Sequence, residues 1–190
     1  MKTALKKRLA DYARFAAGVL LFANKADAEV IYTDLEPDIA LDTDGNYYAV
    51  DIDNNGSPDF QFLLSTFTIN PSFTYYYTFR LLAAGPFTQN AFAGDVDVSF
   101  YTGSTLFFPY ALSNNVKIDD NLSWQSATMQ FLAWKSWTSI YDNHCANCNW
   151  NSESLYEIFD HFIGIRFVDT ENKNHYGWIR CDVKEDGGIL

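Results

Sequence analysis

Short runs of aromatic and β-branched residues, separated by turn signals, fill most of the chain. Two long runs, residues 59–69 (DFQFLLSTFTI) and 73–82 (FTYYYTFRLL), flank NPS and predict a β-hairpin. Residues 95–101 (DVDVSFY) alternate strictly, as a half-buried strand does. Further runs with strand character are 30–33, 46–52, 105–112, 127–134, 161–169 and 174–183.

This spacing of strands predicts an all-β fold, an antiparallel β-sandwich or barrel-like domain, because alternating helices and parallel strands are not seen in the pattern. At most one or two short helices are expected. One of them is residues 152–162 (SESLYEIFDHF), where Ser152 or Ser154 would cap the first turn. Its apolar residues at helical spacing are Leu155, Ile158, Phe159 and Phe162.

The amino terminus has the three parts of a secretory signal peptide: a basic start, an apolar run from Phe15 to Ala23, and ADA before the cleavage point. Residues 1–28 are therefore predicted to form a signal-peptide helix that is removed after Ala28. An amphipathic first helix of the mature domain is the alternative. No other stretch approaches the roughly 18 apolar residues of a membrane span. The mature chain is thus expected to be secreted or held at the outer cell surface.

Removal of residues 1–28 leaves residues 29–190, which is the size of a single domain. The removed segment holds six of the 13 basic and two of the 24 acidic side chains, which leaves seven against 22 and a net charge of −15. Such acidity argues against nucleic acids and anionic membranes as partners. It suits cations, and it equally suits a protein that merely has to stay soluble outside the cell.

Residues 49–62 (AVDIDNNGSPDFQF) contain the most chemically specific pattern. Counted from Asp51, carboxylates fall at positions 1, 3 and 9, an amide at 5 and glycine at 6. The predicted ligands are Asp51, Asp53, Asn55, Ser57 through its backbone carbonyl, and Asp59. Calcium prefers such oxygen ligands, and glycine at position 6 lets the loop coil tightly. A structural Ca²⁺ is therefore the predicted cofactor.

The loop departs from a helix-loop-helix calcium site, since position 12 is Phe62 and the flanking residues are predicted strands. The missing ligands are expected from Asp42 and Asp44. The competing interpretation is a hairpin turn at NNGSP with solvated acids. Crowding of three like charges in one loop favours the cation, because a divalent ion relieves their repulsion.

The chain has three cysteines, which limit the possible disulfides and metal sites. In an exported protein Cys145 and Cys148, in HCANC, most simply form a disulfide, while Cys181 lies far downstream. Two alternatives stay open: a disulfide from Cys181 to one of the pair, and a zinc site that would combine His144, Cys145 and Cys148 with His161 or Cys181.

Tryptophans suggest a second function. Trp124, Trp137 and Trp150 are candidates for stacking on sugar rings, as in a carbohydrate-binding module, whereas Trp134 is expected in the core. A glycoside hydrolase is a weaker alternative, in which Glu153, Glu157 and Asp160 beside His161 would supply acid and base; His175 is expected to be a strand residue rather than a base.

The C-terminal segments 162–167 (FIGIRF) and 175–180 (HYGWIR) predict another hairpin. Its Gly164 and Gly177 should admit close neighbours, and Arg166 and Arg180 should pair with acids or lie over aromatic rings.

Together with the export signal, residues 30–41 (VIYTDLEPDIAL) and 47–62, this hairpin resembles uncharacterised exported β-rich proteins of Gram-negative bacteria. Proteins of that kind often end in a type IX or exosortase-type sorting tail.

The resemblance implies an extracellular β-rich domain without an established enzyme activity. The chain is therefore predicted to be a non-enzymatic surface or extracellular-matrix module, and glycans or cell-surface proteins are the predicted partners. The resemblance also implies that a closing strand and a sorting tail would follow the chain's last residues, KEDGGIL.

Overall fold

In the computed structural model the chain divides into two compact units, Met1–Asp34 and Leu35–Leu190. The structure describes residues 33, 37–72, 75–98, 103–138, 142–144, 148–151, 157–184 and 187–190. The predicted signal peptide, residues 1–28, lies outside the described residues, so its export role stays a prediction.

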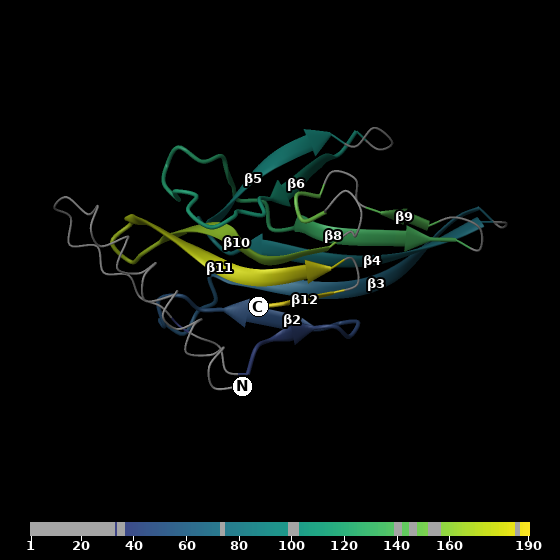
Figure 1. Ribbon diagram of the computed structural model, residues 1–190, viewed down its shortest axis with the longest axis horizontal. Coiled ribbons are helices and arrows are strands. Elements are labelled where there is room, and N and C mark those ends of the chain that lie inside the picture. The colour runs from purple at the N-terminus through teal and green to yellow at the C-terminus, as the bar shows by residue number, and fades with distance from the viewer. Residues whose placement is uncertain are drawn as a thin grey trace. The chain divides into compact units, whose positions relative to one another are not determined.

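Two antiparallel β-sheets make up the second unit (Figure 1). The seven-stranded sheet, called sheet A, has the order β1-β12-β11-β10-β5-β6, with β7 paired to β5. Its strands are β1 (Ala40–Leu41), β5 (Ala91–Val98), β6 (Thr105–Pro109), β7 (Trp124–Gln125), β10 (Glu157–Val168), β11 (Asn174–Lys184) and β12 (Gly187–Ile189). The five-stranded sheet B has the order β2-β3-β4-β8-β9. Its strands are β2 (Tyr47–Val50), β3 (Phe60–Ser72), β4 (Tyr75–Pro86), β8 (Gln130–Trp137) and β9 (Asp142–His144).

The all-β prediction is confirmed, since the described residues contain strands and no helix. The predicted hairpin of residues 59–69 and 73–82 corresponds to β3 and β4, which pair from Phe60 with Pro86 to Ser72 with Tyr75. The turn predicted at NPS is wrong, because residues 70–72 belong to β3, which runs on to Ser72 across an irregularity after Ile69.

The second predicted hairpin is also confirmed, as β10 and β11. Gly164 packs tightly, because an added Cβ would lie 3.0 Å from the Cβ of Ala93 and 3.1 Å from Cδ1 of Leu112. Arg166 lies over the ring of Trp124, 5.5 Å from its centroid. The other arginine, Arg180, contacts an acid instead, with 2.8 Å between its Nε and Oδ1 of Asp160.

The helix predicted for residues 152–162 is wrong where the structure describes it, because residues 157–162 belong to β10. A bulge between Ile158 and His161, with Asp160 at a φ of 56°, explains the misleading pattern. The bulge lets Ile158 and Ile163 both pack into the core although they are five residues apart. In a regular strand such residues would face opposite sides of the sheet.

A closing strand is predicted after the last residues of the chain, KEDGGIL. Instead Gly187–Ile189 form β12, which pairs with β11 on one side and β1 on the other. Sheet A therefore continues beyond the predicted last strand.

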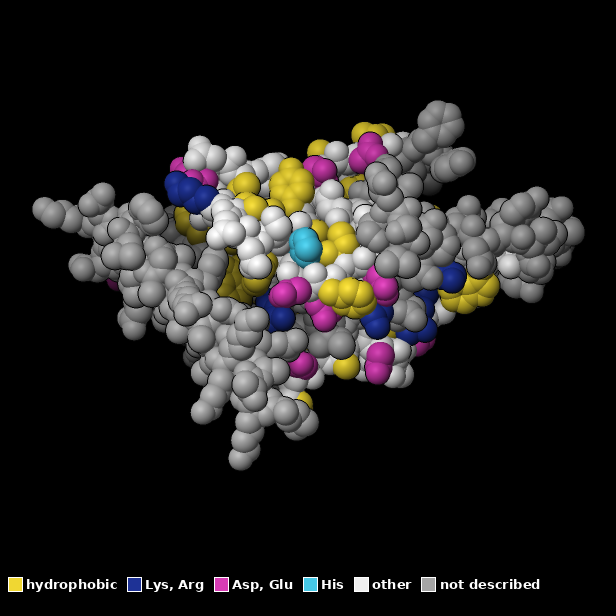
Figure 2. All heavy atoms as spheres, viewed as in Figure 1, with side chains coloured by type: hydrophobic (Ala, Val, Ile, Leu, Met, Phe, Trp, Pro, Cys, Tyr) yellow, Lys and Arg dark blue, Asp and Glu magenta, His cyan; other side chains and the backbone are white. Residues whose placement is uncertain are grey.

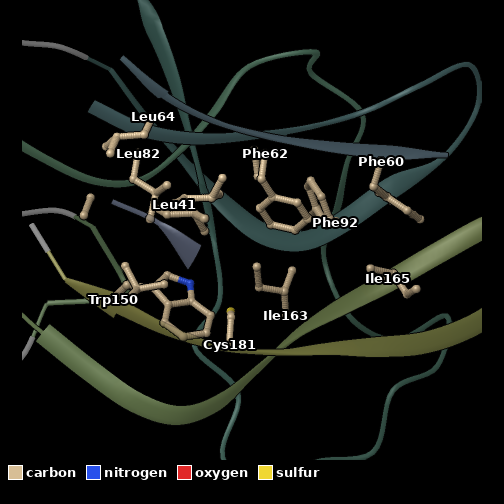
Figure 3. Close-up of a cluster of buried hydrophobic side chains, with 14 residues drawn as sticks. Leu41, Phe60, Phe62, Leu64, Leu82, Phe92, Trp150, Ile163, Ile165 and Cys181 are labelled. Atoms are coloured by element: carbon tan, nitrogen blue, oxygen red, sulfur yellow. The ribbon is translucent and has the colours of Figure 1, made fainter. Parts of the chain in front are cut away.

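Side chains from both sheets fill a shared hydrophobic core, as in a β-sandwich or barrel-like fold. Figure 3 shows Phe60, Phe62 and Leu64 of β3 on one side of this core and Ile163, Ile165 and Cys181 of sheet A on the other. The alternating register of β3 places its three apolar side chains on the same face.

The loop residue Trp150 is fully buried in this core. Its side chain is 0 % exposed, and Figure 3 shows it beside Cys181 and below Leu41 and Leu82. Its Nε1 is buried without a hydrogen-bond partner. Burial of so large a side chain outweighs the cost of that orphan donor.

Replacement of Trp150 by alanine is expected to lower the free energy of unfolding by about 3–5 kcal/mol, because the lost ring leaves a cavity between the two sheets. Tyr47→Ala is the matched control, since Tyr47 is 54 % exposed and its truncation should change stability by about 0.5 kcal/mol or less. Urea unfolding followed by circular dichroism measures both. Equal effects of the two substitutions would contradict the burial of Trp150 in the core.

Candidate metal centre

The acidic loop, residues 51–59, connects β2 and β3 of sheet B. The two strands pair up to Val50 and Phe60, and the Asp59 amide donates to the Val50 carbonyl at 2.7 Å. These contacts close the loop at its base. Residues 51–59 therefore form a compact turn whose start and end are fixed by the sheet.

Three carboxylates of this loop converge. One oxygen each from Asp51, Asp53 and Asp59 lies within 4.8 Å of the others. Asp53 is exposed, Asp51 is half-buried and Asp59 is buried. The structure thus brings together the three acids that the sequence pattern predicted as metal ligands.

Backbone amides of the loop hold two of these carboxylates in place. Asp51 accepts hydrogen bonds from the amides of Gly56 at 2.8 Å and Asn55 at 3.2 Å. Asp53 accepts from the same Asn55 amide at 3.1 Å and from the Asn55 side chain at 2.9 Å. The loop is therefore ordered around its acids, as an Asx-type turn is.

Asp59 is fixed from two sides. Its Oδ2 accepts the Ile52 amide at 2.8 Å, and its Oδ1 accepts Nδ2 of the buried Asn90 at 2.9 Å. Asp59 is only 8 % exposed, and burial of its carboxylate without hydrogen-bond partners would be costly. These two donors satisfy it. Each oxygen retains a lone pair that is free for a cation.

The backbone of the loop takes left-handed conformations at two positions. Asn54 has a φ of 56° and Gly56 a φ of 86°. Asparagine and glycine tolerate this region better than other residues. The prediction that glycine at the sixth position permits a tight coil is consistent with this geometry.

The donor set indicates which ions fit. The cluster offers carboxylate oxygens, which hard cations such as Ca²⁺ and Mg²⁺ prefer, whereas zinc favours nitrogen and sulfur. Oxygens on opposite sides of one Ca²⁺ lie up to about 5 Å apart, since each Ca–O bond is about 2.3–2.6 Å long. The 4.8 Å limit on the three oxygens falls within that span. The three acids have the spacing needed to hold a metal ion.

Asn55 and Ser57 take other roles in the structure. The Asn55 side chain donates to Asp53, and its Oδ1 accepts the Ser57 amide at 2.8 Å. These bonds stabilise the turn. Ligation by the Asn55 side chain and the Ser57 carbonyl stays a prediction.

Asp42 and Asp44 do not join the acid cluster, contrary to the sequence prediction. Asp44 accepts the Thr66 amide, and the carbonyl of Asp42 accepts Nη2 of Arg80. Thr66 is six residues along β3 from Phe60, at which the acidic loop ends. The turn before β2 therefore brings these acids to a different part of sheet B.

The state of the cysteines in the structure favours a disulfide over a zinc site. Cys148 is disulfide-bonded, and Cys181 is free and buried. Burial, followed by the charge of Asp182, raises the pKa of the Cys181 thiol well above its usual value. The predicted partner Cys145 lies outside the described residues. A zinc site that uses Cys148 is wrong, because its sulfur is already in a disulfide, and a Cys181 disulfide is wrong too.

The three tryptophans proposed for sugar stacking have different environments. Trp150 is wrong as a stacking platform, because its fully buried ring cannot meet a sugar. Trp124 is half-buried, with Tyr176 at 5.6 Å between ring centroids, Arg166 over its ring and its Nε1 donating to the Asp119 carbonyl. Trp137 is half-buried in β8. Sugar stacking at Trp124 and Trp137 stays a prediction.

Of the groups considered for hydrolysis, Asp160 and His161 contact other groups, and Glu157 is the first residue of β10. Asp160 contacts Arg180, and Nδ1 of His161 lies 2.8 Å from the Phe159 carbonyl. Glu153 lies outside the described residues. His175 is a strand residue as expected, with its Nε2 2.7 Å from Oδ2 of Asp169. Hydrogen bonds from the Lys173 amide, which has the larger effect, and from His175 lower the pKa of Asp169. These hydrogen bonds stabilise the turn between β10 and β11.

Asn90 is the important residue that the sequence analysis missed. It lies after β4, between Asp59 of sheet B and the end of β10 in sheet A. No sequence motif marks it, because its partners are 31 and 78 residues away.

The conformation of Gly56 gives a test of the loop geometry. Gly56→Ala is expected to lower the free energy of unfolding by about 1–2 kcal/mol, because alanine resists a φ of 86° although the added Cβ would meet open space. Gly56→Asn should cost less, since asparagine tolerates this conformation. Chemical denaturation measures both. Two variants as stable as the parent protein would contradict the left-handed turn.

Compared with known proteins, the chain matches no family model, no curated protein and no solved structure. Within the described residues, no helix has the length and hydropathy needed to span a membrane.

Proposed function

We propose that this chain is a non-enzymatic, exported surface or extracellular-matrix module whose acidic loop is stabilised by a bound Ca²⁺. The observation that carries the proposal is the convergence of Asp51, Asp53 and Asp59 within 4.8 Å. Export rests on the signal-peptide pattern of residues 1–28.

The loop is irregular, and backbone amides hold its carboxylates, so Ca²⁺ fits this loop better than other hard cations do. Mg²⁺ demands near-ideal octahedral geometry and retains several waters, whereas Ca²⁺ accepts six to eight oxygens in flexible arrangements. Water and the predicted Asn55 and Ser57 ligands would complete the shell. Extracellular modules typically bind Ca²⁺ with dissociation constants of about 10⁻⁴–10⁻³ M, which suits a site with three acids.

A stabilising role is favoured over a catalytic one. The carboxylates of the loop accept hydrogen bonds from backbone amides and from Asn90, and no histidine of the described residues belongs to the cluster. Metal-assisted hydrolysis would need an open coordination position beside a base. The cation would instead offset the mutual repulsion of the three acids and hold β2 against β3.

On the face drawn in Figure 2, the described residues do not form a single strongly charged docking surface. Figure 2 shows acidic, basic and hydrophobic side chains lying next to one another on that face. Exposed hydrophobic residues such as Val98, Phe159 and Met129 are scattered over several segments. Glycans or cell-surface proteins remain the partners proposed from the sequence.

Added CaCl₂ is expected to raise the melting temperature of the chain, and EDTA should reverse the rise. At a Ca²⁺ concentration of 100 times the dissociation constant, the gain is about 2.7 kcal/mol, because the ion binds the folded state alone. Asp53→Ala should abolish the response, since it removes one of the three converging carboxylates. Differential scanning calorimetry measures the shift.

The control variant is Asp120→Ala, which makes the same charge change at an exposed acid outside the cluster. It should retain the full calcium response. An unchanged melting temperature of the parent chain in CaCl₂ would refute the calcium proposal.

A further inference from the structure

We infer that Asn90 is a positioning residue of the calcium site, and that it couples the occupancy of the acidic loop in sheet B to the end of β10 in sheet A. This inference rests on the proposed calcium binding. It assigns to a residue outside the loop a role in the affinity of the site, and it predicts where in the second sheet the cation is sensed.

The geometry around Asn90 joins three segments through one side chain. Its Nδ2 donates to Oδ1 of Asp59 at 2.9 Å and lies 3.3 Å from the Asp59 carbonyl. Its Oδ1 accepts the amide of Val168, the last residue of β10, at 3.0 Å. Asn90 is 1 % exposed, so water does not compete for these bonds.

The turn that carries Asn90 is itself docked on Asp59. The Phe87 amide donates to the Asp59 carbonyl at 2.8 Å, and the Asn90 amide donates to the Phe87 carbonyl at 3.1 Å. Both the backbone and the carboxylate of Asp59 are therefore held by the segment between β4 and β5. A movement of Asp59 toward a cation has to be transmitted to this segment.

The chemistry of asparagine suits this position. The side chain must donate to a carboxylate and accept from a backbone amide at the same time, and a primary amide does both. A partner that orients a metal ligand commonly contributes about 10–100-fold to metal affinity. Because Asn90 sets the direction of the Asp59 carboxylate, its loss should weaken calcium binding by a factor in that range.

Coupling is reciprocal in such a chain of bonds. If a bound cation repositions or polarises the Asp59 carboxylate, the hydrogen bond from Asn90 to Asp59 changes, and the opposite end of the amide responds at Val168. The Val168 amide should therefore report calcium binding although it belongs to the other sheet.

The test combines two measurements on the full chain. Isothermal titration with CaCl₂ is expected to give a dissociation constant at least about tenfold larger for Asn90→Ala than for the parent chain. In ¹H–¹⁵N NMR spectra, CaCl₂ should shift the Val168 amide signal in the parent chain and leave it unshifted in Asn90→Ala. The Gly56 amide, which donates to Asp51, should shift in both.

Asn149→Ala is the matched control. Asn149 also bridges two partners with its Nδ2, Oδ1 of Asp95 at 3.1 Å and the Phe108 carbonyl at 3.0 Å, and neither belongs to the acidic loop. Its removal should lower stability while the calcium dissociation constant stays within about twofold of the parent value. This is the result expected of an asparagine that stabilises the fold without affecting the calcium site.

The outcomes separate the two proposals. Calcium binding by the parent chain with no Val168 shift, or with the same affinity in Asn90→Ala, overturns the role of Asn90 and leaves the calcium site standing. No calcium binding by the parent chain overturns both. The Val168 measurement on the parent chain needs no variant, so it decides the matter even if Asn90→Ala does not fold.

Discussion

The buried carboxylate of Asp59 is the group on which the arrangement of this protein depends. A carboxylate that is 8 % exposed must be compensated, and here the Ile52 amide and the Asn90 side chain supply the donors. The hydrogen bond from Ile52 fixes the acidic loop, and the hydrogen bond from Asn90 fixes the turn before β5. Since Asn90 also accepts from Val168, one acid at the start of β3 ties both sheets together.

This placement accounts for the proposed role of the cation. A metal ion at a flexible loop tip would order that loop alone, whereas an ion at Asp59 acts where β2, β3 and the turn before β5 meet. The hydrophobic core supplies most of the stability, because Phe62, Ile163 and Trp150 bury large apolar surfaces between the sheets. Under this proposal, a bound cation would stabilise one arrangement of the loop at the edge of that core.

The sequence predicted the parts of the fold that local patterns encode. Alternation in DFQFLLSTFTI and FIGIRF marks strands because side chains in a strand alternate between faces, and the spacing of Asp51, Asp53 and Asp59 marks the acid cluster. The bulge at Asp160 broke this alternation and imitated a helix.

Long-range contacts left no such pattern. Trp150 lies two residues after Cys148 in a segment outside the strands, and its burial depends on both sheets. The bonds of Asn90 join segments that are far apart in the chain, so only the folded structure reveals them.

The most direct measurement is a crystal structure of the chain grown with CaCl₂, with the ion located by anomalous scattering. The account predicts one site in the acidic loop, with oxygens of Asp51, Asp53 and Asp59 at about 2.3–2.6 Å from the ion and Asn90 still bound to Asp59. A loop that keeps its hydrogen bonds without an ion at saturating calcium, or an ion bound elsewhere, would contradict it.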